Sequence, residues 1–461
     1  MAARDLNAGG AGADRATPMT RAAPFGSWES PFPIEMVTKG AVGLAEVKAR
    51  DGVRWWLEGR PDEGGRQVLV RREPDGSTTR LSPEGFNVRN RVHEYGGGAY
   101  AVDGDLVVIS DFETGRLHRL TSPGVTEPFT PERAWRYADL AIDRARNRVL
   151  AVREDHEPAT LQRHGEAENT LVAIDLARGD STVLASATDF VSSPRLSPDG
   201  RRLAWLRWNH PNMPWDGTEL VVAELDTDGV PGEPAVVAGS ATDWIAQPRW
   251  SRRGVLHFIA EPGGWMNLYR LGNDGLVHAV FETEAEFAFP DWNFGFSNYA
   301  FDAGGAIVAI GRSRGRDRMY RIAAEGSSAD EIPVDFTEMS YLAMDGGTAV
   351  FRAASPSRGW GIFELDLDSG EVRPVREGSS EDDVDPADVS IAQLIEFPTT
   401  AGQTAFGLYY PPHNREFRGP DGERPPLVVT SHGGPTAQAS TAFQVGVQLF
   451  TSRGFGVLDV D

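Results

Sequence analysis

The stretch LVVTSHGGPTAQAS, residues 427–440, contains residues that could stabilise a developing negative charge. An apolar run ends at His432, Gly433, Gly434 and Pro435, and a predicted helix follows. Glycines at the end of a buried strand leave their backbone N–H groups accessible, and fixed N–H groups can stabilise the oxyanion of an acyl-transfer intermediate. In α/β-hydrolases one such donor comes from the loop after the third strand. The alternative is a tight turn that needs glycine only for its geometry.

An oxyanion loop of this kind serves a nucleophile and a general base, which follow it in the α/β-hydrolase order of serine, acid and histidine. His432 is the last histidine of the 461 residues, and Ser440 and Ser452 do not lie in a G-x-S-x-G motif. We therefore expect that none of the catalytic triad is present, that the chain is a fragment cut within its catalytic domain, and that it is inactive as written.

The sequence does contain one G-x-S-x-G, GRSRG at 311–315. It lies between AIVAI and RMYRI, which are both predicted strands. A nucleophile elbow needs a strand-to-helix turn, so this motif is out of context. Ser313 is predicted to lie in a hairpin and not to be the nucleophile.

The elements that must position the loop begin with a repeat. Alternating apolar residues, followed by a glycine turn, recur with glycines 48, 55, 50, 46, 51 and 44 residues apart, at Gly76, Gly124, Gly179, Gly229, Gly275, Gly326 and Gly370. Alternation with period two is typical of a strand with one buried face, and Asp-Gly or Ser-Gly closes a hairpin. A period of about 50 residues indicates a β-propeller. Seven copies predict seven blades, give or take one; unrelated hairpins in a sandwich are the alternative.

After the repeat the composition changes. The acidic stretch REGSSEDDVDPADVS predicts a linker. Two antiparallel strands, a strand at 427–432, a helix over 440–454 and the strand FGVLDVD are then predicted, and strand-helix-strand order indicates a βαβ unit. The fold class is thus an all-β seven-bladed β-propeller followed by the N-terminal part of an α/β-hydrolase domain. The predicted segments are a disordered N-terminus at 1–31, the propeller at 32–375, the linker at 376–390 and an incomplete α/β-hydrolase (peptidase) domain at 391–461.

Composition and charge exclude several classes. The absence of cysteine removes disulfides, thiolate nucleophiles and zinc-thiolate sites. A net charge of -22 repels phosphate backbones, so nucleic acid is not expected as a partner. No apolar run approaches the ~18 residues of a membrane span, and no signal-peptide core is seen, so we expect a cytoplasmic protein without a membrane partner. No phosphate-binding loop or dinucleotide fingerprint is found, and no cofactor is expected.

Four stretches resemble one family of enzymes: RVHEYGGGAY (91–100), WNHPNMPWDGTEL (208–220), FAFPDWNFGFSNYAF (287–301) and PPLVVTSHGGPTA (425–437). They are similar to the prolyl oligopeptidase family of serine peptidases, in the branch of acylaminoacyl-peptidases and dipeptidyl aminopeptidases. Its members have a β-propeller that caps an α/β-hydrolase domain. The resemblance implies that Gly434 donates its N–H to the oxyanion, while His432, Gly433 and Pro435 shape the loop.

The resemblance implies a serine-type peptidase that hydrolyses short peptides, with a propeller that restricts access; a homo-oligomer is left open. A non-catalytic propeller used as a binding or scaffold module is the alternative, and the propeller argues against an esterase of the HGGG type. Arg153, Glu154 and Asp155 could hold a peptide's α-ammonium in the propeller, as carboxylates do in related dipeptidyl peptidases; a solvated hairpin is the other interpretation. Their spacing to His156 and His164 matches no metal-ligand set, so no metal is expected.

Overall fold

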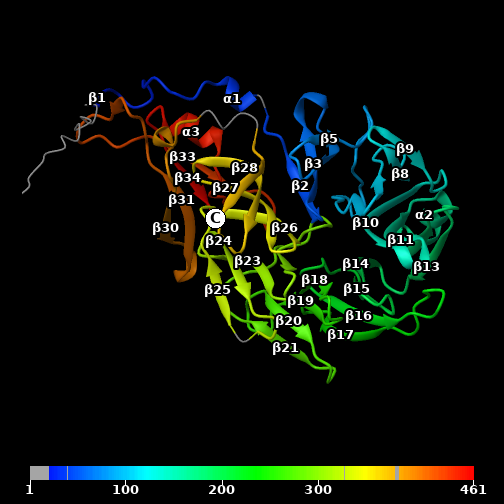
Figure 1. Ribbon diagram of the computed structural model, residues 1–461. Coiled ribbons are helices and arrows are strands. Elements are labelled where there is room, and N and C mark those ends of the chain that lie inside the picture. Colours follow the sequence, from blue (N-terminus) through cyan, green and yellow to red (C-terminus); the bar gives the residue numbers. More distant parts are fainter. Residues whose placement is uncertain (1–19, 39, 327, 379–383) are drawn as a thin grey trace, which may run out of the picture. The chain divides into compact units, whose positions relative to one another are not determined.

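The computed structural model describes residues 20–38, 40–326, 328–378 and 384–461 (Figure 1). The chain divides into two compact units. Unit 1 comprises Met1–Thr38, Asp383–Gly433 and Gln444–Asp461, and unit 2 comprises Lys39–Asp382 and Gly434–Phe443. The residues that follow the HGG sequence thus belong to unit 2. No helix in the described ranges is long and apolar enough to cross a membrane.

Unit 2 is built of four-stranded antiparallel sheets, each made of four consecutive strands, and its described residues form seven of them. The first four are β2–β5 (Leu44–Arg50, Val53–Arg60, Arg66–Arg72, Thr78–Arg80), β6–β9 (Tyr100–Asp103, Leu106–Ser110, Leu117–Ser122, Val125–Pro128), β10–β13 (Trp135–Asp143, Arg148–Asp155, Glu168–Asp175, Ser181–Ala185) and β14–β17 (Phe190–Leu196, Arg202–Trp208, Thr218–Glu224, Ala235–Ser240). The others are β18–β21 (Ile245–Trp250, Leu256–Ala260, Asn267–Leu271, Val277–Phe281), β22–β25 (Tyr299–Phe301, Ile307–Ser313, Arg316–Ile322, Ala329–Ile332) and β26–β29 (Glu338–Asp345, Thr348–Ser355, Arg358–Asp366, Val372–Arg376). Helix α2, Pro158–His164, lies between β11 and β12.

The seven glycines of the sequence repeat occupy equivalent places in these sheets. Each lies in the hairpin between the third and fourth strands and has a φ between 72° and 86°. Only glycine adopts this region without a steric penalty, which explains why the turn residue recurs. The predicted succession of hairpins is therefore confirmed. Gly200 lies in a further hairpin turn, between β14 and β15.

Neighbouring sheets of unit 2 share hydrophobic clusters. Trp55 of the first sheet packs with Tyr100 of the second, and each following pair of sheets is joined by a cluster of its own. A further cluster joins Val350 of the seventh sheet to Trp56 of the first. The packing thus runs through the sheets in chain order and returns to its start (Figure 1), although no strand pairs the first sheet with the last among the described residues. A β-propeller requires such packing, because each sheet buries its faces against its neighbours.

The first strand of five sheets contains a β-bulge with a non-glycine residue at positive φ. These residues have φ between 50° and 56° and are Glu46, Asp139, Ser193, Gln247 and Tyr341. Such residues are uncommon, and bulges re-aim side chains next to functional sites. Three of the five side chains accept a backbone N–H from the first strand of the next sheet or from the residue just before it: Glu46 from Ala99 at 3.1 Å, Asp139 from Ser193 at 2.6 Å and Gln247 from Asn298 at 2.8 Å.

Unit 1 contains a mixed four-stranded sheet. Its order is β30 (Gln393–Pro398), β31 (Thr404–Tyr410), β34 (Gly456–Val460) and β33 (Leu427–Ser431). Strands β30 and β31 are antiparallel, whereas β33 and β34 are parallel and are connected through α3 (Val445–Thr451). The predicted hairpin and the predicted βαβ unit are both confirmed. A short parallel pair, β1 (Arg21–Ala22) with β32 (Phe417–Arg418), and α1 (Glu35–Thr38) complete the unit.

The helix predicted over residues 440–454 is wrong at its start, because α3 begins only at Val445. The N–H of Thr441 donates to the Glu338 carboxylate at 2.8 Å, and the N–H of Phe443 donates to the Ser355 carbonyl at 2.9 Å. These N–H groups are committed to unit 2 and do not enter a helical ladder. A helix periodicity in the sequence does not reveal such competing acceptors.

Two segments that were predicted to be disordered or to be a linker are partly described. Residues 20–31 of the predicted disordered segment hold β1 and the buried Trp28, whereas residues 1–19 lie outside the described residues. Of the predicted linker at 376–390, residues 379–383 lie outside the described residues. At its end Asp388 is buried and pairs with Arg415 Nε at 2.6 Å. Part of each predicted segment is therefore packed: residues 20–31 of the first and the end of the second.

Candidate functional site

The HGG loop leaves β33 at His432 and adopts a left-handed backbone conformation at Gly434. Gly434 has a φ of 72°, a region that favours glycine. A Cβ at Gly433 or Gly434 would meet no heavy atom within 4 Å, so backbone conformation and not crowding requires glycine at 434. The N–H of Gly434 has no hydrogen-bond partner within the described part of the chain. An accessible donor in a fixed turn is what an oxyanion needs.

Unit 2 holds the residues that follow Gly434 at two points. Trp292 Nε1 donates a hydrogen bond of 2.6 Å to Oγ1 of Thr436. Five residues further on, both the N–H and the hydroxyl of Thr441 donate to Glu338 Oε1, at 2.8 and 3.1 Å. The segment 434–443 is therefore fixed to the β-sheets by side chains and not only by its covalent ends.

Glu338 is itself part of a buried ion network. Its side chain is 5% exposed and pairs with Arg312, which also binds Asp317 through Nε at 2.7 Å and Nη2 at 3.0 Å. Burial raises the pKa of Glu338, while the positive charge of Arg312 opposes that shift. A buried ion pair that loses one partner leaves an uncompensated charge, so this network resists displacement of Thr441.

The indole of Trp292 is the point where the four quoted stretches meet. Its centroid lies 4.9 Å from the ring of Tyr95 and 4.6 Å from the ring of Trp215. Tyr95 belongs to the stretch 91–100 and Trp215 to the stretch 208–220, while Thr436 belongs to the stretch with the HGG loop. Aromatic pairs at these separations stabilise each other beyond simple burial.

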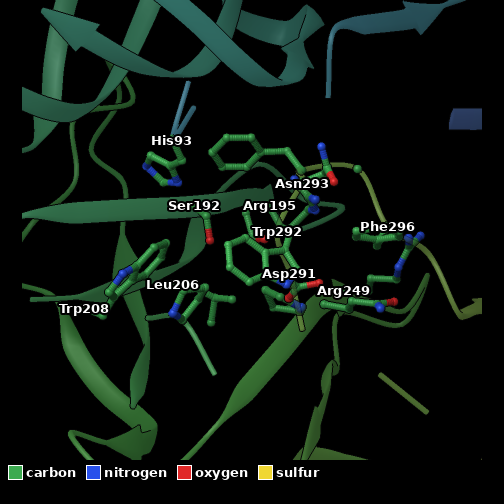
Figure 2. Close-up of a pocket in the computed structure, with 16 residues that line it drawn as sticks. His93, Ser192, Arg195, Leu206, Trp208, Arg249, Asp291, Trp292, Asn293 and Phe296 are labelled. Carbon is green, nitrogen blue, oxygen red and sulfur yellow. The ribbon is translucent and has the colours of Figure 1, made fainter. Parts of the chain in front are cut away.

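Trp292 also lines a cavity of unit 2. Its walls are the loop 291–296, the first strands β14 and β18, strand β15 and the loop residue His93. Figure 2 shows Asp291 and Trp292 at the centre of this group, with His93 and Trp208 on one side and Arg249 and Phe296 on the other. The cavity therefore combines aromatic surface with charged groups of both signs.

Burial shifts the pKa of three groups that line this cavity, His93, Asp291 and Arg249. It lowers the pKa of His93 to about 4, so the imidazole is neutral at neutral pH. The ring lies 5.3 Å from Phe190 and 5.5 Å from Trp208, both in edge-on geometry. Burial also raises the pKa of Asp291 to about 7. Shifts of this size are frequent at functional sites, because burial disfavours the charged form.

A second cavity of about 480 Å³ adjoins the first one, and Arg195 and Arg249 line both. It also contains Glu46, Lys48 and Asp139. Burial, opposed by the charge of Lys48, raises the pKa of Glu46 to about 7. Burial likewise lowers the pKa of Lys48 to about 8, and Glu46 opposes that shift. The first strands of the sheets thus surround a polar space with more cations than fully ionised acids.

The predicted ammonium-binding residues lie at the end of β11. Glu154 is buried and accepts the N–H of His93 at 2.6 Å, while its second oxygen lies 2.9 Å from His156 Nε2. Arg153 is buried over the ring of Trp135 at 4.4 Å. Asp155 Oδ1 accepts the N–H of the following turn at 2.8 Å. Glu154 is thereby joined to the cavity through His93, and its contact with an ammonium group stays a prediction.

The predicted hairpin at Ser313 is confirmed. Ser313 ends β23 and pairs with Arg316 of β24, so GRSRG is a strand-to-strand hairpin. The glycines of HEYGGGAY allow close packing, because a Cβ at Gly97 would lie 2.3 Å from the Phe294 carbonyl oxygen. Gly97 and Phe294 also form a parallel bridge.

Arg195, Arg249 and Asp291 were not predicted as site residues. They come from different sheets or loops, and no local spacing connects them. A usable signal was present for Asp291, which precedes Trp292 in the aromatic-rich stretch 287–301.

No protein-family model and no curated protein matches the sequence. Solved structures do. A mutant puromycin hydrolase complexed with PGG is 34% identical, with a TM-score of 0.87 over 95% of this chain and 69% of that chain. A puromycin-hydrolyzing peptidase of Mycobacterium tuberculosis is 31% identical over the same shares, with a TM-score of 0.87. A prolyl endopeptidase structure, 14% identical with a TM-score of 0.69 over 91% of this chain and 61% of that chain, shows the fold alone.

These similarities define the class as a peptidase whose larger unit is an all-β assembly of four-stranded sheets. The chain belongs to the prolyl oligopeptidase family.

Proposed function

We propose that this chain provides the substrate cavity and the oxyanion loop of a serine-type peptidase that hydrolyses short peptides, of the acylaminoacyl- or dipeptidyl-peptidase type. The contacts of Trp292 are the main support. The indole lines the cavity and also binds Thr436, two residues after Gly434. A loop that is fixed to the substrate-binding unit holds the Gly434 N–H in a constant geometry, as electrostatic stabilisation of a transition state requires.

In the proposed architecture the seven sheets of unit 2 are the blades of a seven-bladed β-propeller. The cluster that joins the seventh sheet to the first supports a closed ring. The mixed sheet of unit 1 is the N-terminal part of an α/β-hydrolase domain, which the parallel β33-α3-β34 unit supports. The HGG loop then follows a strand of this sheet, as an oxyanion loop does.

The names of the similar proteins indicate their reactions. One is a puromycin hydrolase and another is a puromycin-hydrolyzing peptidase. We extend the peptidase activity to the present chain as the hydrolysis of short peptides. The cavities of unit 2 would limit the size of such substrates.

During acyl transfer a nucleophile attacks the carbonyl carbon, and the carbonyl oxygen becomes negatively charged. The proposed role of Gly434 is to donate its N–H to that oxygen. Loss of one such donor typically costs about 10²–10³ in kcat. None of the triad was predicted within these 461 residues. We therefore expect the chain to bind peptides without hydrolysing them.

The test uses the purified 461-residue chain with aminoacyl- and dipeptidyl-p-nitroanilides, a fluorophosphonate probe and calorimetry with short peptides. We expect peptide binding, no release of p-nitroaniline and no labelled serine. Stoichiometric labelling of a serine would disprove the expected inactivity, and absence of peptide binding would disprove the substrate assignment. The coding sequence after codon 461 separates the two functional alternatives: an in-frame G-x-S-x-G followed by a histidine supports the peptidase, and a stop codon favours a non-catalytic binding module.

A further inference from the structure

The two cavities beside Trp292 concentrate positive charge in a chain whose net charge is -22. The larger cavity contains the cations Lys48, Arg195, Arg249 and Arg252. The carboxyl groups that line the two cavities are those of Glu46, Asp139 and Asp291. Burial raises the pKa of both Glu46 and Asp291 to about 7, so these two groups are only partly ionised at neutral pH. Cations therefore outnumber ionised acids.

Arg249, like Lys48 and Arg252, forms no ion pair within 4.0 Å with a carboxylate of the described residues, and it is the one of these three that lines both cavities. Its guanidinium lies 5.6 Å from the centroid of the Tyr299 ring. Asp139 is already occupied, because it binds Arg195 Nη1 at 3.1 Å and the Ser193 N–H at 2.6 Å. Burial lowers the pKa of Arg249 to about 10, so the group is still charged at neutral pH. A desolvated cation without a counter-ion is unfavourable.

An anion from outside the chain would remove this imbalance. A guanidinium offers paired N–H donors that match the two oxygens of a carboxylate. Arg195 and Arg249 line both cavities, and the smaller cavity also contains Trp292, the residue that binds Thr436 of the oxyanion loop. The larger cavity, about 480 Å³, has the size of a small-molecule pocket and not of a site for one inorganic ion.

We propose that Arg249, assisted by Arg195, binds the α-carboxylate of a short peptide in these cavities. The protein then selects peptides with a free C-terminus over their C-terminal amides. This inference rests on the proposed peptidase function and specifies its substrate class. Burial of the charged contact gives it the strength that an exposed ion pair lacks.

Calorimetry on the full 461-residue chain tests the inference with trialanine and trialanine amide, which differ only at the C-terminus. We expect trialanine to bind at least about tenfold more tightly than the amide, about 1.4 kcal/mol. Arg249→Gln abolishes this ratio, and Arg249→Lys keeps part of it because the charge remains. Arg253→Gln is the matched control, since Arg253 is 72% exposed and lies outside both cavities. Equal thermal melting of the variants shows that the fold is intact.

The outcomes are separable. Equal binding of the two peptides, or a ratio that persists in Arg249→Gln, overturns the carboxylate site while peptide binding itself stands. Binding of neither peptide overturns the proposed function and this inference together. The last measurement is a titration with inorganic phosphate. If phosphate binds tightly while trialanine and trialanine amide bind equally, the cavities bind free anions. That result overturns the assignment to a peptide carboxylate.

Discussion

Trp292 Nε1 donates a hydrogen bond of 2.6 Å to Oγ1 of Thr436, across 144 residues of sequence. The bond joins the loop between the fifth and sixth sheets of unit 2 to the segment that follows the HGG sequence. The β-sheet assembly that we propose as the substrate-binding unit thereby also holds the residues next to the proposed oxyanion donor, Gly434. In this arrangement the position of the donor depends on residues far from it in sequence.

Replacing either partner of this bond should loosen the segment. We expect Trp292→Phe and Thr436→Val each to destabilise unit 2, with a coupling energy of about 0.5–1.5 kcal/mol in a double-mutant cycle, the usual net value of one hydrogen bond. Denaturant titration measures the coupling, and amide exchange of residues 434–438 should accelerate in both variants.

Thr436→Ser is the control for this cycle, because it keeps the hydroxyl and should keep the slow exchange. Additive effects of Trp292→Phe and Thr436→Val would show that the bond contributes nothing in solution.

Gly434 and Gly433 make a matched pair, since a Cβ at either position meets no heavy atom within 4 Å. They differ in conformation: Gly434 has a φ of 72°, and Gly433 is outside that region. Gly434→Ala should therefore cost about 1–2 kcal/mol through backbone strain, whereas Gly433→Ala should be nearly neutral. Thermal and denaturant unfolding measure the free-energy cost of each substitution. Equal costs would mean that position 434 relaxes to negative φ and that the turn is not required.

The repeating part of the fold could be predicted from the sequence, because its signals are local. Alternation and a turn glycine recur in every sheet, and Gly76 through Gly370 lie where the hairpins close. The helix start at Val445 could not be predicted in the same way. There, Thr441 bonds to Glu338, which is 103 residues away, and long-range acceptors leave no periodic mark.

Only the part of the candidate site that is contiguous in sequence could be predicted. The HGG loop is contiguous, so residue types and order were sufficient to propose it. The cavity is assembled from Arg195, Arg249 and Asp291 on separate strands and loops, and the fold alone brings them together. Arginine and aspartate are common surface residues, so their types gave no signal. The four quoted stretches did contain information on contacts, since three of them meet the ring of Trp292, which lies in the fourth.

The buried ion network beneath Thr441 should be sensitive to a single charge. Asp317 is 0% exposed, binds Arg312 at 2.7 and 3.0 Å and accepts the Met339 N–H at 2.6 Å. Asp317→Asn should cost about 3–5 kcal/mol, because it removes the charge that compensates a buried guanidinium. Urea unfolding gives the value, and faster amide exchange at Thr441 should accompany it.

An exposed pair that joins β24, the strand of Asp317, to β25 provides the comparison. Arg318 and Glu331 are 45% and 49% exposed and 2.8 Å apart. Glu331→Gln should cost less than about 1 kcal/mol. Similar costs for Asp317→Asn and Glu331→Gln would show that the buried network does not stabilise unit 2.

Asp291 should make the stability of unit 2 fall as the pH rises. Burial raises the pKa of its carboxyl to about 7 from 3.8, so between these values the folded state binds more protons than the unfolded state. The contribution of Asp291 is then greatest at low pH and is lost as the pH increases through about 7. Asp291→Asn cannot titrate. In urea titrations the unfolding free energy of the wild type should therefore fall from pH 5 to pH 8 relative to that of Asp291→Asn. Asp199→Asn is the control: a hydrogen bond from the Ser197 hydroxyl lowers the pKa of Asp199, so this substitution should leave the slope between pH 5 and 8 unchanged. Parallel curves for the wild type and Asp291→Asn would show that the Asp291 carboxyl titrates as an exposed group.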